Sequence, residues 1–116
     1  MDSILDSIKK ILGIDSDYTA FDTDIILAIN TAFFILWQLG VGPQDSPFTI
    51  SGSESKWNDV VEDGKIEMYK SYVGLRVRLL FDPPTSSFLV EAINSQIKEY
   101  EWRMICGMDE YNAKEA

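Results

Sequence analysis

The 116-residue sequence has no histidine and only one cysteine, Cys106. Without histidine, the chain lacks the commonest general acid–base catalyst, the base of Ser-His-Asp and Cys-His arrangements, and the commonest metal ligand. A single cysteine excludes an internal disulfide and cannot build a zinc site alone, and it fits a reducing compartment. The sequence also lacks a Gly-rich phosphate loop and a Walker-type Gly-Lys-Ser/Thr motif. We therefore expect no enzyme activity, no catalytic residue, no bound metal and no cofactor.

Basic residues are also scarce. The chain has 10 Lys and Arg against 19 Asp and Glu, which gives a net charge of −9. Tight binding to a phosphate backbone needs a clustered Lys/Arg surface, and the sequence shows none. We expect no sequence-specific nucleic acid partner, and weak DNA binding through a local patch is the less favoured alternative. The acidity also has an ordinary explanation, because net charge keeps a small protein soluble.

Long apolar runs are missing as well. The longest, residues 25–39, is interrupted by Asn30, Thr31 and Gln38 and falls short of a transmembrane span. Residues 1–10 carry two acidic side chains and lack the apolar centre of a signal peptide. We therefore expect no membrane partner, and a protein that stays in the cytoplasm of the cell that makes it.

What the sequence does contain is four stretches in which apolar residues recur with helical spacing. They cover residues 2–12, about 22–39, 63–81 and about 86–105. Gly74 interrupts the third stretch at a cost of about 1 kcal/mol, and a close helix crossing is the usual compensation. The chain also has three Trp, five Tyr and six Phe to pack in a core or an interface. These features predict an all-α fold, a small bundle of about four helices.

Two segments fall outside this pattern. Residues 40–56 are rich in Gly, Pro, Ser and Asp, and they predict a long irregular loop between the second and third helices. Within this loop, residues 48–50 (Phe-Thr-Ile) could form at most a brief strand. Gly107 ends the last helical pattern. We therefore predict that residues 1–106 form a single helical domain and that residues 107–116 form a flexible acidic C-terminal tail.

The third and fourth helices are separated by Phe-Asp-Pro-Pro, residues 81–84. Pro83 has no N–H and clashes with the preceding turn, so the third helix must end just before it. Pro84 keeps the chain extended or opens the next helix, for which residues 85–87 (Thr-Ser-Ser) offer capping oxygens. The local prediction is a rigid, tight corner between two antiparallel helices.

Four aspartates flank the start of the second helix, at Asp15, Asp17, Asp22 and Asp24. Their Asp-x-Asp spacing resembles the start of an EF-hand loop, which needs Gly at its sixth position and Glu at its twelfth. Counted from Asp15, the sequence has alanine and isoleucine at those positions. We interpret the four acids as helix-capping or solvated side chains of a connector.

Several side chains are candidates for an interface. Arg76 and Arg78 lie between apolar positions of the third helix, where they either form a solvated face or make an ion pair with another subunit or protein. Phe48 and Trp57 lie in or beside the long loop, where they either cover the core or anchor an interface. With the corner and one further aromatic residue, the candidate interface consists of Phe48, Trp57, Arg76, Arg78, Phe81, Asp82, Pro83, Pro84 and Trp102.

Several short motifs follow one another in a distinctive order. Ile-Lys-Lys-Ile-Leu-Gly-Ile (8–14) is followed by Gln-Leu-Gly-Val-Gly-Pro (38–43), Phe-Thr-Ile (48–50) and Trp-Asn-Asp (57–59). Tyr-Val-Gly-Leu-Arg-Val-Arg-Leu-Leu-Phe-Asp-Pro-Pro (72–84) then leads to Ile-Lys-Glu-Tyr-Glu-Trp-Arg (97–103). Over about residues 2–105, this order resembles the head–tail connector (adaptor) family of long-tailed bacteriophages and prophages, also labelled phage DNA-packaging proteins. The 72–103 block is the most specific part of the resemblance.

The resemblance implies a helical structural protein of the virion, without catalysis. Its copies would assemble as a ring that docks beneath the portal protein after DNA packaging. The ring would offer a surface to the next connector, stopper or tail protein at the head–tail junction, after synthesis in the bacterial cytoplasm. In such proteins the C-terminal segment, here about residues 106–116, often becomes ordered against the portal. We further expect part of the negative charge to line the DNA passage, and the Asp-Pro-Pro corner to set the wedge shape of the subunit.

An interpretation from a different class also fits the sequence: a small acidic regulatory or inhibitor module that binds a single protein partner. Oligomeric state and gene neighbourhood discriminate between the two, because a gene between capsid and tail genes favours the connector. A DNA-binding packaging factor is disfavoured by the charge.

Overall fold

The protein is all-helical in the part of the chain that the structure describes. The structure is a computed structural model that describes residues 3–42 and 46–115, and the side chains of residues 3–42, 46–62 and 64–106. Its elements are α1 (Ile4–Leu12), α2 (Asp22–Gln38), the 3-10 turns η1 (Trp57–Asp59) and η2 (Asp63–Lys65), α3 (Ile66–Phe81) and α4 (Ser87–Glu115). The predicted all-α fold of four helices with a long loop after the second is therefore confirmed. None of the described helices has the length and apolarity of a membrane span.

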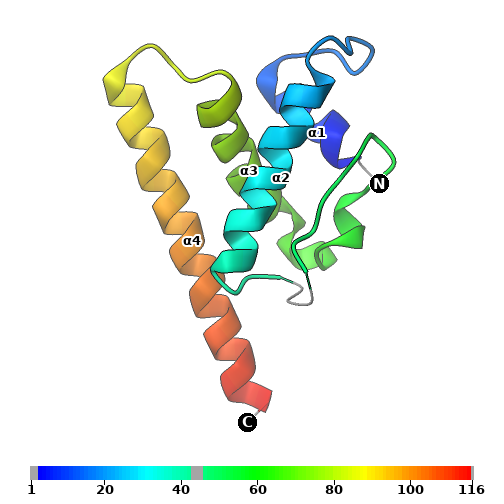
Figure 1. Cartoon of the computed structure of the whole chain (residues 1–116). Coiled ribbons are helices and arrows are strands. Elements are labelled where there is room, and N and C mark those ends of the chain that lie inside the picture. The colour runs from blue at the N-terminus through cyan, green and yellow to red at the C-terminus, as the bar shows by residue number, and fades with distance from the viewer. Residues whose placement is uncertain (1–2, 43–45, 116) are drawn as a thin grey trace.

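α3 lies at the centre of the bundle and contacts α1, α2 and α4. α2 and α4 run in the opposite direction to α3 (Figure 1). Each helix turns an apolar face towards one shared core. A fully buried aliphatic side chain contributes about 1.5–3 kcal/mol to folding. The buried residues include Ile8 of α1, Ile29 and Leu36 of α2, Val73 and Val77 of α3, and Ile97 of α4.

α1 has clear start and stop signals. The Ser3 side chain accepts a hydrogen bond from the Asp6 backbone N–H at 3.3 Å, and Gly13 takes the left-handed conformation with φ of 79°. α1 crosses α3 at Gly74, where an added Cβ would lie 3.0 Å from Ile11 Cδ1. The prediction that Gly74 marks a close helix crossing is confirmed.

The loop between α2 and η1 is irregular, and its described part, residues 46–56, contains no strand. Asn30 of α2 holds it by pairing with both backbone groups of Ile50. The Asn30 amide donates to the Ile50 carbonyl oxygen at 3.1 Å, and the Ile50 N–H donates to Asn30 Oδ1 at 2.8 Å. The side chain of Ile50 then packs into the core. The residues Phe-Thr-Ile therefore cross α2 as an anchored loop.

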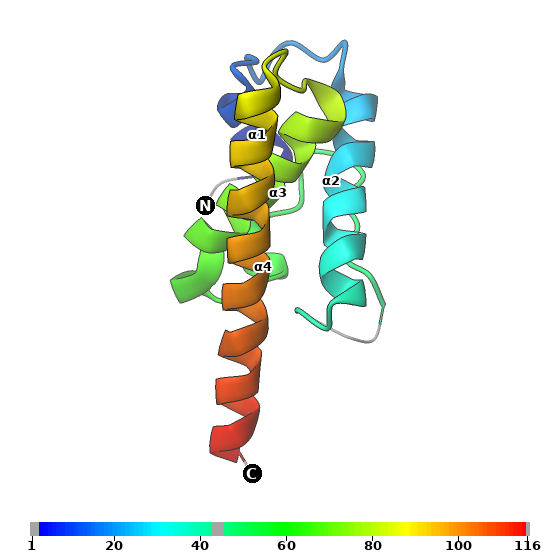
Figure 2. The same ribbon diagram turned by 90° about the vertical axis from the view of Figure 1, so that its left-hand side faces the viewer.

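α4 is longer than the sequence predicted. It begins at Ser87 but continues through Gly107 to Glu115, a total of 29 residues. The prediction that the helical pattern ends at Gly107 was wrong, because one glycine costs a helix only about 1 kcal/mol and no proline follows it. The C-terminal half of α4 extends beyond the other helices (Figures 1 and 2). Residue 116 lies outside the described residues, and the flexibility of residues 107–116 stays a prediction.

α3 and α4 diverge towards the corner that joins them. Away from the corner, Ile97 and Met104 of α4 are buried, whereas Phe88 and Leu89 next to the corner are exposed. Leu80, in the last turn of α3, is also exposed although it follows the helical spacing of the core. The antiparallel arrangement is confirmed, but the chain crosses between the helices in an open arch, so the prediction of a tight corner was wrong (Figure 1).

Candidate functional site

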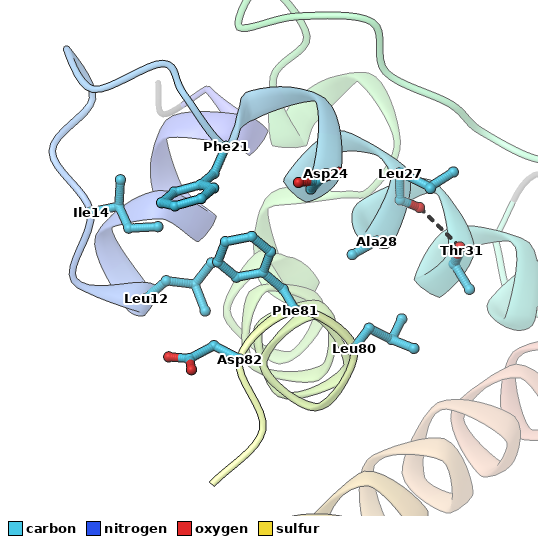
Figure 3. A pocket seen from close by; sticks show the side chains of 10 residues that line it. All are labelled: Leu12, Ile14, Phe21, Asp24, Leu27, Ala28, Thr31, Leu80, Phe81 and Asp82. Atoms are coloured by element: carbon cyan, nitrogen blue, oxygen red, sulfur yellow. Dashed lines mark hydrogen bonds between the residues drawn. The ribbon is translucent and has the colours of Figure 1, made fainter.

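A groove opens at the end of the bundle that carries the corner (Figure 3). We call it the corner groove. Its volume is about 810 Å³, and it lies between the end of α1, the α1–α2 connector, α2 and the end of α3. Most of its lining is apolar, and two carboxylates stand in it. The lining residues are Leu12, Ile14, Phe21, Asp24, Leu27, Ala28, Thr31, Leu80, Phe81 and Asp82.

Aromatic contacts build one side of the corner groove. The rings of Phe21 and Phe81 pack edge to face with centroids 5.4 Å apart, which joins the α1–α2 connector to α3 (Figure 3). Tyr18 packs on Phe21 in the same manner at 5.6 Å. On the other side, Leu27 of α2 is 67% exposed and Leu80 of α3 is 55% exposed. The groove therefore combines a packed aromatic side with an open aliphatic side.

Lys9 holds the α1–α2 connector in place. Its side chain is 1% exposed, although lysine is rarely buried unless it is paired. The ammonium donates hydrogen bonds to the carbonyl oxygens of Ser16 at 3.0 Å and Tyr18 at 2.6 Å, and lies 2.8 Å from Asp22 Oδ1. That carboxylate oxygen is buried without a hydrogen bond to the described residues, so the ion pair compensates its burial. Lys9 thereby fixes the wall of the corner groove that carries Phe21.

A polar cluster ties α4 to α3 near the middle of both helices. Tyr72 Oη and Arg76 Nη2 both donate to Glu101 Oε2 at 2.7 Å, and Arg76 Nε donates to Tyr72 Oη at 3.1 Å. Arg76 also lies over the Tyr72 ring, with Cζ 5.7 Å from the centroid. Burial, followed by the hydrogen bond to the Glu101 carboxylate, raises the pKa of Tyr72 well above its ordinary value. The cluster fixes the position of α4 on the bundle.

Three of the predicted interface residues serve the fold. Trp57 is 1% exposed and its Nε1 donates to Ser7 Oγ at 3.2 Å, so Trp57 packs in the core of its own chain. Phe48 is half-buried against Phe33, with ring centroids 5.3 Å apart, and it also covers the core. Arg76 makes an ion pair with Glu101 of its own chain at 2.7 Å.

The other predicted interface residues remain accessible. Phe81 and Asp82 line the corner groove, and Pro83 and Pro84 follow them in the arch. Arg78 and Trp102 are exposed on α3 and α4. Their role in an interface stays a prediction. Four of them, residues 81–84, are consecutive in sequence and lie where the chain leaves α3.

Sequence reasoning missed three anchoring side chains. Lys9 occupies a position on the apolar stripe of α1, between Leu5 and Leu12, and a lysine on such a stripe is a signal of a buried ion pair. Asn30 gives a signal only as a polar residue that interrupts the apolar run of α2. For Glu101, the signal was weaker, because its partners Tyr72 and Arg76 are distant in sequence.

The corner groove suits packing better than chemistry. Among the described residues, no group of three or more His, Cys, Asp or Glu side chains is placed to hold a metal ion. The lining offers mostly apolar surface with two carboxylates, so an occupant would be held mainly by burial of apolar surface.

Comparison with known proteins identifies the family. A family model described as "Phage connector protein" matches residues 4–110, which include α1, α2, α3 and α4 as far as residue 110. No match was found among curated proteins or among solved structures. The matched region contains both the corner groove and the exposed start of α4. The chain therefore belongs to the phage connector protein family, and its role is that of a structural head–tail connector.

Proposed function

We propose that this connector forms a ring at the head–tail junction of a tailed phage or prophage. The ring docks on the portal protein after DNA packaging and joins the next connector, stopper or tail component. The observation that carries the proposal is the family match over residues 4–110. The protein is accordingly a virion component that acts by assembly, without catalysis.

The distribution of exposed apolar side chains supports assembly. A closed ring needs two different patches on each subunit, because its contacts are heterologous. Leu27 and Leu80 supply apolar surface at the corner groove, and Phe88 and Trp102 supply it on α4. Burying these side chains against a neighbouring subunit would stabilise such an assembly.

The first experiment is absolute mass in solution by light scattering, over a concentration series, with and without the cognate portal protein. We expect a discrete species of many subunits, formed either alone or on the portal. A chain that stays monomeric near 13.2 kDa and does not bind the portal contradicts the proposal. A one-to-one complex with a single unrelated protein would instead favour the regulatory module.

A further inference from the structure

The corner groove lacks an occupant within the described part of the chain. Leu27 of α2 and Leu80 of α3 both line it, and both are more than half exposed (Figure 3). A pair of exposed leucines beside a groove of about 810 Å³ leaves apolar surface in water. A partner that covers this surface gains the free energy of its burial.

The corner groove also concentrates negative charge. Asp24 and Asp82 both line it and both are exposed. Asp82 is the C-cap of α3, where the helix dipole already places partial negative charge, so its carboxylate is unfavourable in the isolated subunit. A favourable occupant of the groove is therefore apolar and electropositive.

The start of α4 has both properties. Phe88 is 76% exposed, and Leu89 beside it is 49% exposed. The first turn of α4 contains no acidic side chain, and its cap is a long hydrogen bond of 3.4 Å from the Leu89 N–H to Ser86 Oγ. The positive end of the helix dipole makes this turn electropositive.

Building on the ring function proposed above, we propose that the corner groove of one subunit receives the first turn of α4, with Phe88 and Leu89, from a second copy of this chain. The carboxylates of Asp24 and Asp82 then face the N–H groups of that turn. The charges are complementary: the negative end of α3 meets the positive end of the neighbouring α4. The contact joins two different patches, so each subunit can use both at once.

The positions of the two patches favour closure. The α1–α2 connector, the end of α3 and the start of α4 all lie at the same end of the molecule (Figures 1 and 2). Neighbours joined through these patches can therefore lie side by side without a translation along the ring axis. A heterologous contact of this kind repeats into a ring when its rotation closes.

Cross-linking between two single-cysteine variants of the full chain tests the occupant. In a Cys106→Ser background, Thr31→Cys marks the groove and Ser87→Cys marks the start of α4, and both leave the apolar contacts intact. With a short bifunctional maleimide at high protein concentration, we expect dimers in the mixture of the two variants and none with either variant alone. The chain carrying both cysteines should give a ladder of oligomers.

A charge exchange tests the electrostatic part. Ser87→Glu places a carboxylate in the first turn of α4, which favours the isolated helix but opposes Asp24 and Asp82 of a neighbour. We expect Ser87→Glu to weaken self-association about tenfold or more, with the thermal midpoint of the monomer unchanged or higher. Asp82→Lys should also weaken association, and combining it with Ser87→Glu should restore most of the loss. If the double variant loses as much self-association as either single variant, or the sum of both losses, the charge pairing is overturned.

Leu39→Ser is the matched control, because Leu39 is exposed at the opposite end of α2. It should leave association unchanged, whereas Phe88→Ser should abolish it. If the cysteines at positions 31 and 87 of the same chain are cross-linked, the inference is overturned. The groove would then hold the start of α4 from its own subunit. Rings that form without the Thr31–Ser87 cross-link overturn the inference but leave the proposed function standing. If no ring forms alone or on the portal, the proposed function fails as well.

Discussion

At the scale of single residues, Lys9 stabilises the fold through a buried ion pair and two hydrogen bonds. Lys9→Met removes the ammonium from two carbonyl oxygens and from the Asp22 carboxylate, which stay behind without their partner. We expect the free energy of unfolding to fall by about 3 kcal/mol, the lower end for a broken buried pair, because Asp22 keeps some contact with water. Lys10→Met, next to it and exposed, should change stability by less than about 0.5 kcal/mol. Urea denaturation followed by tryptophan fluorescence measures both, and equal effects would contradict the role of Lys9.

Asn30 has the same kind of role for the long loop. Asn30→Leu leaves the N–H and the carbonyl of Ile50 without their partner at a buried position, so we expect a loss of about 2–3 kcal/mol. Thr31→Val is the control, because the Thr31 hydroxyl donates only to the Leu27 carbonyl of its own helix, at 2.9 Å. Hydrogen exchange gives a local readout: the Ile50 amide should exchange faster in Asn30→Leu. Unchanged protection of that amide would count against the anchoring role.

Tyr72 makes stability depend on alkaline pH. Its folded-state pKa is raised above the value of about 10 that an unfolded tyrosine has, so below that pH the phenol is neutral in both states and its contribution is complete. Above about pH 10 the Tyr72 phenol is deprotonated in the unfolded state but still protonated in the folded state, so the free energy of unfolding falls as pH rises. Tyr69, whose pKa is raised by burial and by the Glu62 charge, adds to the same loss. Tyr72→Phe should therefore show a smaller loss of stability between pH 9 and 11, by about 1 kcal/mol or more, and an identical pH profile would contradict this prediction.

At the scale of elements, the arch between α3 and α4 sets how far Phe88 stands from Leu80. We predict that Pro83→Ala with Pro84→Ala impairs assembly more than folding, because the freed chain lets the start of α4 change its angle. The urea midpoint should shift by a small amount, whereas the apparent dissociation constant of self-association should rise about tenfold. Pro47→Ala, in the loop before Ile50, serves as the control for proline removal. Normal assembly of the double variant would show that the corner does not set the subunit's shape.

The elements themselves were largely readable from the sequence. Local signals determine them: Ser3 and Gly13 bound α1, and Pro83 ends α3. The predicted helix end at Gly107 was wrong because a glycine stops a helix only when the following residues favour another conformation. Leu80 and Leu89 follow the apolar spacing of their helices although both are exposed. The spacing shows only which residues share a helix face. It cannot say whether another part of the same chain covers that face.

At the scale of the whole molecule, the contacts that shape the corner groove join residues far apart in the sequence. Local sequence patterns carry no information about which elements contact each other, so these contacts could not be predicted from the sequence. At the corner groove they are the pairs Lys9–Asp22 and Phe21–Phe81, and Arg76–Glu101 is a similar distant pair near the middle of α3 and α4. The candidate interface illustrates the consequence: an aromatic residue such as Trp57 has the same sequence signal whether it anchors a partner or covers the core, and only its burial distinguishes the two.

The net charge of −9 leads to a prediction about the assembled ring. A ring around exiting DNA must not grip it, and carboxylates along the passage repel phosphates, whereas Lys and Arg would release counterions and bind them. We therefore expect the lumen of the ring, seen by electron cryomicroscopy, to be lined mainly by Asp and Glu. Filter binding at physiological salt should show no retention of double-stranded DNA by the ring. An uncharged or basic lumen, or DNA binding that weakens steeply with salt, would mean that the acidic residues serve solubility alone and that the passage holds the DNA.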